Sequence, residues 1–252
     1  MTVVFVHAHP DDEAIFTGGT MAALARGGER VVLVLATGGE AGGEVARRAE
    51  ETDRAVELLG VHRVVRLGHH DSGMDGDAAN DHPDAFWRRD VDDTAAIVAD
   101  VCREEKADAL VTYDDHGIYG HLDHVQCHLV GIRAAELAGV GCIYEATVDR
   151  EALHFVETHL VEEAALSAGP VVHDLGLAAS RIGLPTVEIT TVVDVRDVLD
   201  IKRAAMAAHA SQIPETGSAM ALGTAAFAGV YGFEWYRRRS PRDGPLDRLG
   251  LL

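Results

Sequence analysis

Residues 3–13 read VVFVHAHPDDE, a short apolar run that ends abruptly in histidines and acids. Four further apolar runs follow, at residues 31–36 (VVLVLA), 64–67, 107–113 (ADALVTY) and 142–148. They contain little polar alternation, which is typical of parallel strands that are covered on both faces. Helix-like segments separate these runs. The rhythm therefore predicts an α/β fold with a Rossmann-like, doubly wound, mostly parallel sheet.

The expected helices are a segment that ends at Gly27, residues 44–59, a long segment from about residue 85 and one that begins near residue 121. Later in the chain, residues 187–193 resemble a strand and residues 196–210 a helix.

The periodicity fades beyond Ile213, where glycine, proline, serine and arginine become frequent. We therefore expect a single domain over residues 1–252, with a core of about 1–212 and a C-terminal extension of about 213–252. Residues 237–239 (RRR) are interpreted as a solvated surface run.

The composition excludes several classes of protein. The chain has 252 residues, with 41 acidic and 22 basic side chains and a formal net charge of −19. This charge repels phosphates and anionic lipids, so we expect neither nucleic acid nor a membrane as partner. No apolar run approaches the ~20 residues that span a bilayer. The first ten residues also lack the basic and long apolar segments of a secretory signal.

Cysteine usage indicates a reducing compartment. The three cysteines, Cys102, Cys127 and Cys142, are an odd number without short pairing. They are expected to be free thiols that behave as small hydrophobic residues. We therefore predict a cytoplasmic protein. The sequence does not indicate an oligomeric state.

The first motif that suggests chemistry is HAHPDDE, at residues 7–13, directly after the first predicted strand. Ligands of open α/β sheets bind beyond the carboxyl ends of the strands, which favours a metal site here. In the alternative interpretation, Pro10 starts a helix and Asp11 and Asp12 stabilise its positive end. That alternative leaves His9 unexplained, and this motif alone keeps both open.

The second motif is YGHLDHVQCH, at residues 119–128, which follows the fourth apolar run. His121 and His124 are three residues apart and share a helix face. Two strand ends that each offer histidine and carboxylate can converge on one cation. Two histidines and one carboxylate leave a fourth position for water, as in a catalytic zinc site. The alternative is a pair of surface histidines at a helix N-terminus.

Two other stretches follow predicted strands. LATGGEAGG, at residues 35–43, lacks the spacing of a phosphate-binding loop, so a close approach of backbone to ligand is the better hypothesis. In LGHHDSGM, at residues 67–74, we interpret His69 and His70 as loop residues and Asp71 as the ligand contact. A serine hydrolase is disfavoured because no GxSxG motif occurs. The scattered histidines, interpreted as ordinary surface or core residues, are His62, His82, His154, His159 and His173.

HAHPDDE followed by GHLDH resembles the signature pair of the PIG-L/LmbE-like zinc-dependent N-deacetylases. Other stretches similar to the family, in the family's order, are TGGE (37–40), RAEE (48–51), LG (59–60), DSGM (71–74) and KRAAMAAHASQ (202–212). The resemblance covers roughly residues 3–148 and the late helix. The nearest branch is that of the mycothiol deacetylase and the mycothiol S-conjugate amidase.

The resemblance implies a metal site and a base. His9, Asp12 and His124 match the zinc ligands, and Asp11 matches the general base that activates the metal-bound water. Zn²⁺ is the implied cofactor, although the same ligands accept Fe²⁺ or other first-row ions.

The resemblance also implies roles around the reacting amide. His121 matches the residue that stabilises the oxyanion and protonates the leaving amine, and Asp123 matches the acid that tunes it. We expect Asp123 to keep His121 charged by Coulomb attraction, which gives a bell-shaped rate profile. Tyr119 matches a mobile tyrosine over the site, and Arg48 and Asp71 match positions that contact sugar hydroxyls.

The implied activity is hydrolysis of an N-acetyl group from an N-acetylglucosaminyl-type substrate, with a small-molecule amino-sugar conjugate as partner. The alternatives are an amidase acting on a mycothiol-type thiol S-conjugate, a non-catalytic carbohydrate- or metal-binding protein and a nucleotide-dependent transferase. Two departures from the family bear on substrate choice. Ile15 and Phe16 replace small polar residues and are expected to make a nearby wall apolar, and residues 156–185 match nothing in the family.

Overall fold

The computed structural model describes residues 1–155, 182–214, 217–240 and 244–250. Within these residues one seven-stranded sheet has the order β3-β2-β1-β4-β5-β7-β6. The strands are β1 (Thr2–His7), β2 (Arg30–Thr37), β3 (Arg63–His69), β4 (Ala109–Tyr113), β5 (Ile143–Thr147), β6 (Thr191–Asp194) and β7 (Phe233–Arg238). Every pair from β3 to β5 is parallel, and only β7 runs antiparallel to its neighbours. The predicted α/β class with a mostly parallel sheet is confirmed.

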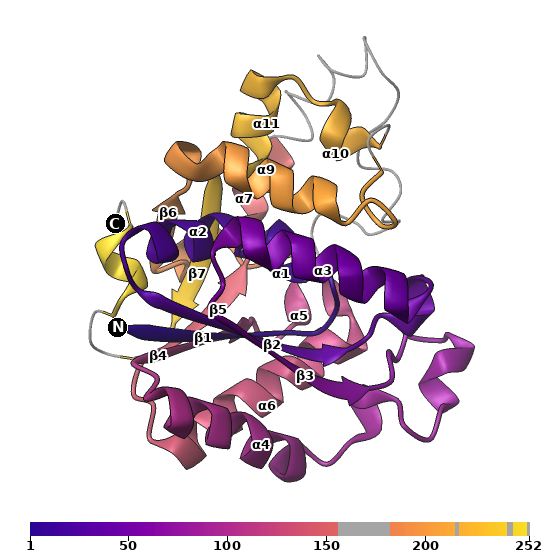
Figure 1. Ribbon diagram of the computed structural model, residues 1–252. Coiled ribbons are helices and arrows are strands. Elements are labelled where there is room, and N and C mark those ends of the chain that lie inside the picture. The colour runs from indigo at the N-terminus through magenta and orange to yellow at the C-terminus, as the bar shows by residue number, and fades with distance from the viewer. Residues whose placement is uncertain (156–181, 215–216, 241–243, 251–252) are drawn as a thin grey trace.

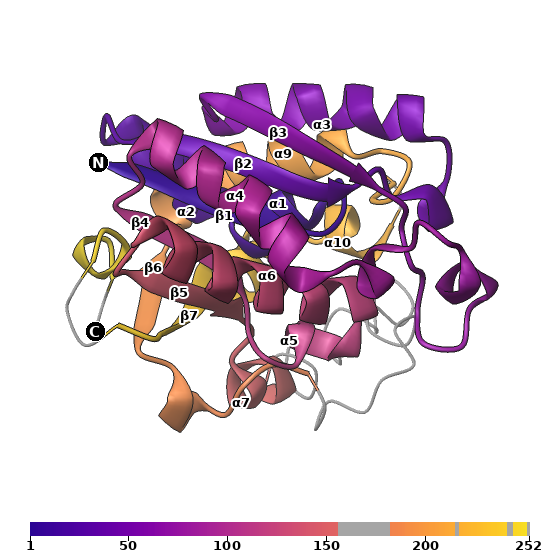
Figure 2. The same ribbon diagram turned by 90° about the horizontal axis from the view of Figure 1, so that it is seen from below.

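Helices cover both faces of the sheet, with α2, α3 and α9 on one face and α4 and α6 on the other (Figures 1 and 2). The helices are α1 (Asp12–Phe16), α2 (Gly18–Arg26), α3 (Val45–Leu59), α4 (Val91–Glu105), α5 (Gly117–Gly120), α6 (Leu122–Ala138), α7 (Arg150–Phe155), α9 (Leu199–Ala208), α10 (Ser218–Ala221) and α11 (Thr224–Tyr231).

The central strand β1 explains why the apolar runs lack polar alternation. Val3 and Phe5 belong to the core beneath α2, α3 and α9, whereas Val4 and Val6 belong to the core above α4 and α6. All four side chains are at most 1% exposed. Because successive side chains of a strand point to opposite faces, both faces of β1 must be apolar.

The strand order creates a crevice at the carboxyl ends of β1 and β4. The chain passes from β1 to β2 and β3 on one side, and then returns to β4 on the other side of β1. Such a reversal opens a gap between the loops that leave the two central strands, and open α/β sheets bind their ligands there. The two histidine-containing motifs lie directly after these two strands.

Two predicted boundaries differ from the structure. The long helix begins at Val91, because the Asp90 side chain caps it by accepting the N–H of Asp93 at 3.0 Å. The late strand is shorter than predicted, since a 3₁₀ turn at Thr186–Glu188 precedes β6.

The C-terminal residues enter the sheet, because β7 lies between β5 and β6. The interpretation of residues 237–239 as a solvated run is wrong for Arg237, whose Nε lies 2.5 Å from buried Glu145 Oε2. Buried Glu234 on β7 accepts the N–H groups of Gly19 and Thr20 at 2.8 Å and faces Lys202 Nζ at 2.6 Å. Because Glu234 points inward, it interrupts the apolar pattern of β7, and the sequence did not predict this strand.

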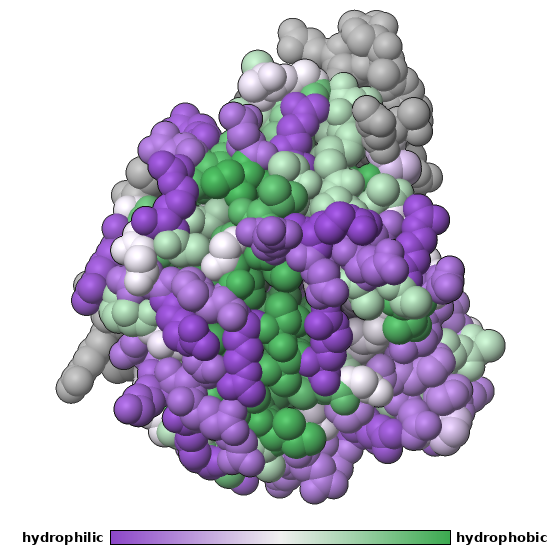
Figure 3. All heavy atoms as spheres, viewed as in Figure 1, coloured by the Kyte–Doolittle hydropathy of each residue, from purple (hydrophilic) through white to green (hydrophobic). Residues whose placement is uncertain are grey.

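Within the described part of the chain, no helix is long and apolar enough to cross a membrane. All three cysteines are free, as predicted, with Cys102 and Cys127 buried and Cys142 half-buried. Hydrophilic side chains cover much of the face in Figure 3, and a band of hydrophobic side chains runs across it.

Candidate active site

A cavity of about 310 Å³ opens at the carboxyl ends of β1 and β4. Segments from five parts of the chain form its wall. The lining residues are His9, Asp11, Asp12, Ala41, Gly42, Arg48, Asp71, Gly73, Met74, Asp77, Tyr119 and His121. The backbone of the glycine-rich turn therefore does approach the site, as its composition predicted.

The turn after β1 is strained at Asp11. Asp11 adopts φ 108° and ψ −31°, a backbone conformation that is unfavourable for a non-glycine residue. The cost of such a conformation is about 1–3 kcal/mol, and surrounding contacts must stabilise it. The Asp12 carboxylate stabilises the turn, because its Oδ2 accepts the His9 N–H at 2.9 Å. The turn places His9, Asp11 and Asp12 along the cavity wall.

The turn after β4 is built around Asp114. Its Oδ1 accepts the N–H groups of His116 and Ile118 at 3.0 and 2.8 Å. Gly117 has φ +62°, and a Cβ there would lie 2.7 Å from the Cβ of His124, so only glycine fits. The tight turn brings Tyr119 to the cavity, and α6 begins just beyond it.

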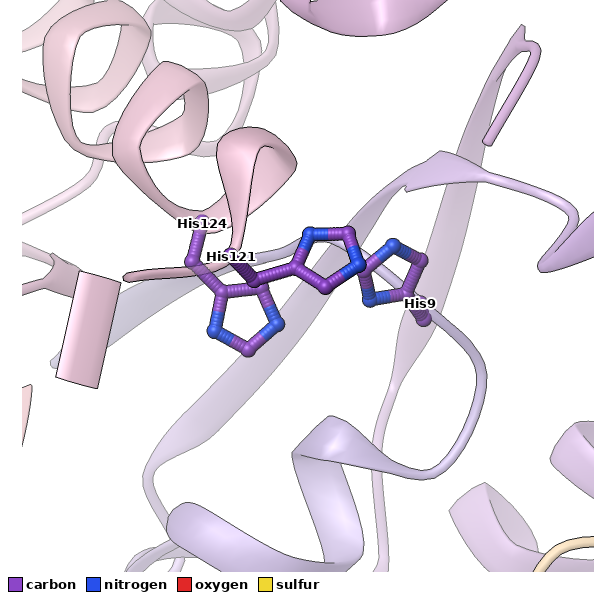
Figure 4. Close-up of side chains that lie close together, drawn as sticks. All are labelled: His9, His121 and His124. Atoms are coloured by element: carbon purple, nitrogen blue, oxygen red, sulfur yellow. The ribbon is translucent and has the colours of Figure 1, made fainter. Parts of the chain in front are cut away.

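Three imidazole rings meet at this place (Figure 4). The ring centroids of His9 and His121 are 4.5 Å apart, those of His9 and His124 5.3 Å, and those of His121 and His124 5.1 Å. One nitrogen from each ring can be chosen so that all three lie within 4.8 Å of one another. The two motifs, more than 100 residues apart in sequence, are therefore close enough to share one cation.

Asp12 lies between two of these rings. Its Oδ2 is 3.2 Å from His9 Nδ1 and 3.3 Å from His124 Nε2. Tyr113, the last residue of β4, donates its hydroxyl to the same oxygen at 2.8 Å. Its ring stacks on that of His124, with centroids 4.1 Å apart and planes 8° apart.

His124 provides the clearest sign that the cluster holds a ligand. Its side chain is fully buried, and within the described part of the chain Nδ1 has no hydrogen-bond partner, while Nε2 has only the contact with Asp12 Oδ2 at 3.3 Å. Unpaired buried polar atoms are costly and rare in folded proteins. A metal ion would satisfy this imidazole, and imidazole with carboxylate is a ligand set that divalent first-row metals accept. The residues present therefore fit a divalent cation.

Opposite charges hold the cluster together when no cation is bound. Burial disfavours a charged His9, but hydrogen bonds to Asp12, Asp123 and Asp71 outweigh it and raise the pKa of His9 well above 6.5. Burial likewise opposes a charged Asp12, yet His124 and His9 hold the pKa of Asp12 well below its usual value. An imidazolium surrounded by carboxylates marks a place where a metal cation can replace a proton.

The structure does not support the expected charge on His121. Burial and repulsion from His9 and His124 lower its pKa to about 4, although Asp123 and Asp71 act in the opposite direction. The Asp123 carboxylate instead accepts hydrogen bonds from the backbone N–H and the hydroxyl of Ser72, and lies 3.2 Å from His9 Nε2. Asp123 contacts His121 through its backbone N–H, which donates to Nδ1 at 3.1 Å. Because Nδ1 accepts this N–H, the neutral form of His121 has its proton on Nε2.

Asp11 lies beside Arg48 at the edge of the cavity. Burial and repulsion from Asp12 raise the pKa of Asp11 to about 7, against the attraction of the Arg48 guanidinium 3.5 Å away. Arg48 also donates to the carbonyl oxygens of Gly39 and Pro10 at 2.7 and 2.5 Å. A carboxylate with a pKa near neutrality has the proton affinity of a general base.

All nine predicted site residues lie together here. Seven line the cavity, whereas His124 and Asp123 lie directly behind the wall and are fully buried. Asp71 lines the cavity and accepts the Gly73 N–H at 2.8 Å, while His69 and His70 do not line it.

Other expectations have different outcomes. Ile15 and Phe16 do not line the cavity: Ile15 packs on the core, and Phe16 packs edge-on against His124 at 6.2 Å. His159, His173 and most of residues 156–185 lie outside the described residues.

Sequence reasoning missed two residues that support the cluster, Tyr113 and Ser72. Tyr113 ends a strand that neighbours β1, and Ser72 follows Asp71 directly. Their positions were visible in the sequence, but nothing in it showed that their hydroxyls face Asp12 and Asp123.

An α/β protein with a histidine–carboxylate cluster at the reversal point of its sheet has the fold and the site of a metal-dependent hydrolase. Residues 4–135 match the family model described as GlcNAc-PI de-N-acetylase (PIG-L). One relative is the 1D-myo-inositol 2-acetamido-2-deoxy-alpha-D-glucopyranoside deacetylase of Thermomonospora curvata. The alignment of 273 positions, gaps included, has 37% identity and covers 96% of this chain and 92% of the relative. The chain therefore belongs to the PIG-L family of de-N-acetylases, as its motifs indicate.

Solved structures share the fold. The N,N'-diacetylchitobiose deacetylase from Pyrococcus horikoshii aligns with a TM-score of 0.57 and 21% identity, over 95% of this chain and 86% of that one. The 4-carboxy-2-hydroxymuconate hydratase from Pseudomonas putida KT2440 aligns with a TM-score of 0.59 and 21% identity, over 97% and 98%. Because a hydratase also has this fold, the reaction must be argued from the site.

Proposed function

We propose that this protein hydrolyses the N-acetyl group of an N-acetylglucosaminyl-type substrate and releases acetate and a free amine. The observation that supports this most is buried His124 behind an open cavity: its Nδ1 has no hydrogen-bond partner in the described part of the chain, and its Nε2 faces Asp12 Oδ2 at 3.3 Å. The relative from Thermomonospora curvata, which is named as an acetamido-sugar deacetylase, matches nearly the whole chain and supports the same reaction.

His9, Asp12 and His124 would hold a divalent cation, for which we propose Zn²⁺, with Fe²⁺ as the alternative that the same ligands accept. Such a cation polarises an amide carbonyl and lowers the pKa of a water molecule toward neutrality. The ligands themselves are held in place by Tyr113, which bonds Asp12, and by Ser72, which bonds Asp123 beside His9.

Asp11 is the residue we assign as general base. It lines the cavity next to Asp12, and its pKa of about 7 allows it to accept a proton from the attacking water. Arg48 lies 3.5 Å away and favours the deprotonated carboxylate before the reaction. The strained backbone at Asp11 fixes the direction in which the carboxylate points.

His121 would stabilise the oxygen that becomes negative as the amide is attacked. Its Nδ1 accepts a backbone N–H, so the Nε2–H is left to donate a hydrogen bond. One such donor contributes roughly 3 kcal/mol to transition-state stabilisation. The ring of Tyr119 lies edge-on to His121, with centroids 6.1 Å apart, and closes the wall on that side.

The lining suits a neutral sugar with many hydroxyls. Asp11, Asp12, Asp71 and Asp77 contribute four carboxylates, whereas the guanidinium of Arg48 already donates to two carbonyl oxygens. Carboxylates accept hydroxyl hydrogen bonds, and they attract the ammonium group that forms when the amine product is protonated. A guanidinium has five N–H donors, so Arg48 keeps others beyond its two bonds to carbonyl oxygens, and we assign Arg48 and Asp71 to the sugar hydroxyls. The free cysteines support a reducing, cytoplasmic location.

The test is acetate release from a panel of N-acetylglucosamine glycosides by protein loaded with Zn²⁺ or Fe²⁺. We expect release from a neutral glycoside, and activity on none of the panel would contradict the proposal. Matched substrates with bulky N-acyl groups test the amidase alternative. Faster cleavage of the bulky amides would favour the amidase over the deacetylase.

A further inference from the structure

The late stretch KRAAMAAHASQ includes a histidine that reaches back to the catalytic turn. His209 follows the last residue of α9, and its Nε2 lies 2.6 Å from Oε1 of Glu13, 196 residues earlier in the chain. Both side chains are 0% exposed. Neither residue lines the cavity, so this contact is separate from the surface that would meet substrate.

Glu13 connects this contact to Asp11. Its second carboxylate oxygen, Oε2, accepts the backbone N–H of Asp11 at 3.0 Å. Asp11 is the residue with φ 108°, in a region where L-amino acids are strained. A strained backbone persists only where neighbouring contacts stabilise it, and the Glu13 carboxylate is one of these contacts.

We propose that His209 is a positioning residue that fixes the backbone, and hence the carboxylate, of the base Asp11 by anchoring the carboxylate of Glu13. The proposal rests on the proposed function, because that function makes Asp11 the base. His209 does not line the cavity and makes no hydrogen bond to Asp11, so its hydrogen-bonded connection to the catalytic turn runs through Glu13, alongside a longer-range Coulomb attraction to Asp11.

Because the Glu13 carboxylate is buried, it needs the hydrogen bond to His209 to stay in place. In the described part of the chain, the recorded partners of its carboxylate are the Asp11 N–H and the His209 ring. A buried carboxylate that loses one of two partners must gain a proton, admit water or turn toward another donor. Each of these changes weakens the acceptor of the Asp11 N–H and allows the strained turn to relax.

A neighbouring contact provides a matched control. Ser211, two residues further along, donates its backbone N–H at 3.0 Å and its hydroxyl at 2.5 Å to buried Glu51 on α3. This contact holds the C-terminal end of α9 against α3, as the His209 contact holds it against α1. Glu51 does not line the cavity, so loss of the Ser211 hydroxyl removes a part-buried hydrogen bond at the same end of α9 without removing a contact of Glu13 or Asp11.

The experiment compares His209→Leu, His209→Gln and Ser211→Ala in the full chain loaded with Zn²⁺. We expect His209→Leu to lower kcat about 10- to 100-fold with little change in KM or metal content, because a misplaced catalytic group costs rate rather than binding. The amide of His209→Gln can still donate to Glu13, so this variant should retain most of the rate. Ser211→Ala should keep the wild-type kcat.

Amide hydrogen exchange of the peptide that contains Asp11 gives a readout independent of activity. We expect faster exchange in His209→Leu and wild-type exchange in His209→Gln and Ser211→Ala. Unchanged exchange and kcat in His209→Leu, or equal losses in His209→Gln, would overturn the proposal. If His209→Leu does not fold, His209→Asn, whose shorter amide falls short of Glu13, replaces it. If wild-type protein releases no acetate, the proposed function fails, and the exchange data still decide the role of His209.

Discussion

The hydroxyl of Tyr113 donates a 2.8 Å hydrogen bond to Oδ2 of Asp12, the carboxylate oxygen that lies between the rings of His9 and His124. Burial and repulsion from Asp12 raise the pKa of Tyr113 well above 10, so its hydroxyl stays protonated and remains a donor. Through this bond, and through the stacking of its ring on His124, one residue orients two of the three proposed metal ligands.

The first prediction concerns this support. Tyr113→Phe should weaken metal binding about 10- to 100-fold, because loss of a group that orients the ligands has a cost of this size. Competition with a chelator of known affinity measures the effect. Tyr144→Phe is the control, since Tyr144 is also buried but its hydroxyl bonds Asp247 in the 3₁₀ turn Leu246–Arg248, and neither residue lines the cavity. Equal affinity in wild type and Tyr113→Phe would mean that the hydroxyl does not orient Asp12.

The second prediction concerns the proton that His9 loses when a metal ion binds. The pKa of His9 lies well above 6.5 without a cation, so His9 is protonated at neutral pH and must lose this proton to bind a metal. Binding should therefore release a proton and weaken as the pH falls below the pKa of His9. Calorimetric titration in two buffers of different ionisation enthalpy measures the number released. Binding without proton release, and with the same affinity at pH 6 and pH 8, would contradict the charge assigned to His9.

The third prediction concerns the attachment of β7. Lys202→Met leaves the Glu234 carboxylate buried without its cation, which should lower the free energy of unfolding by about 3–5 kcal/mol. Arg30→Met is the control, because the Arg30–Glu105 pair is exposed on the arginine side and such pairs contribute about 0–1 kcal/mol. Urea denaturation of the two variants measures the difference. A loss from Lys202→Met no larger than that from Arg30→Met would contradict the importance of this buried pair.

The sequence predicted the sheet because the central strands are apolar on both faces. Val3, Val4, Phe5 and Val6 form a short apolar run typical of a doubly covered strand, and the parallel order follows from the helices between such runs. It did not predict β7, where Glu234 points into the protein and pairs with Lys202 from a distant helix. Pairing between residues far apart in sequence leaves no local pattern.

The sequence likewise predicted only part of the site. The histidines and acids of the two motifs follow strands that are neighbours, so their convergence could be inferred from the order of the sheet. The charge of His121 could not be predicted from sequence, because its pKa depends on burial and on the positions of His9 and His124. The contact between His209 and Glu13 joins residues 196 positions apart in the sequence, and no local pattern predicts it.

The central claim is that the cluster at the ends of β1 and β4 is a catalytic metal site with Asp11 as its base. Acetate release by Asp11→Asn, measured per bound metal ion on the same sample, tests it most directly. The variant keeps His9, Asp12 and His124 but has no carboxylate to accept the proton, so we expect full metal content and a rate lowered about 10²- to 10⁴-fold. Full metal content with the wild-type rate of acetate release would contradict the claim.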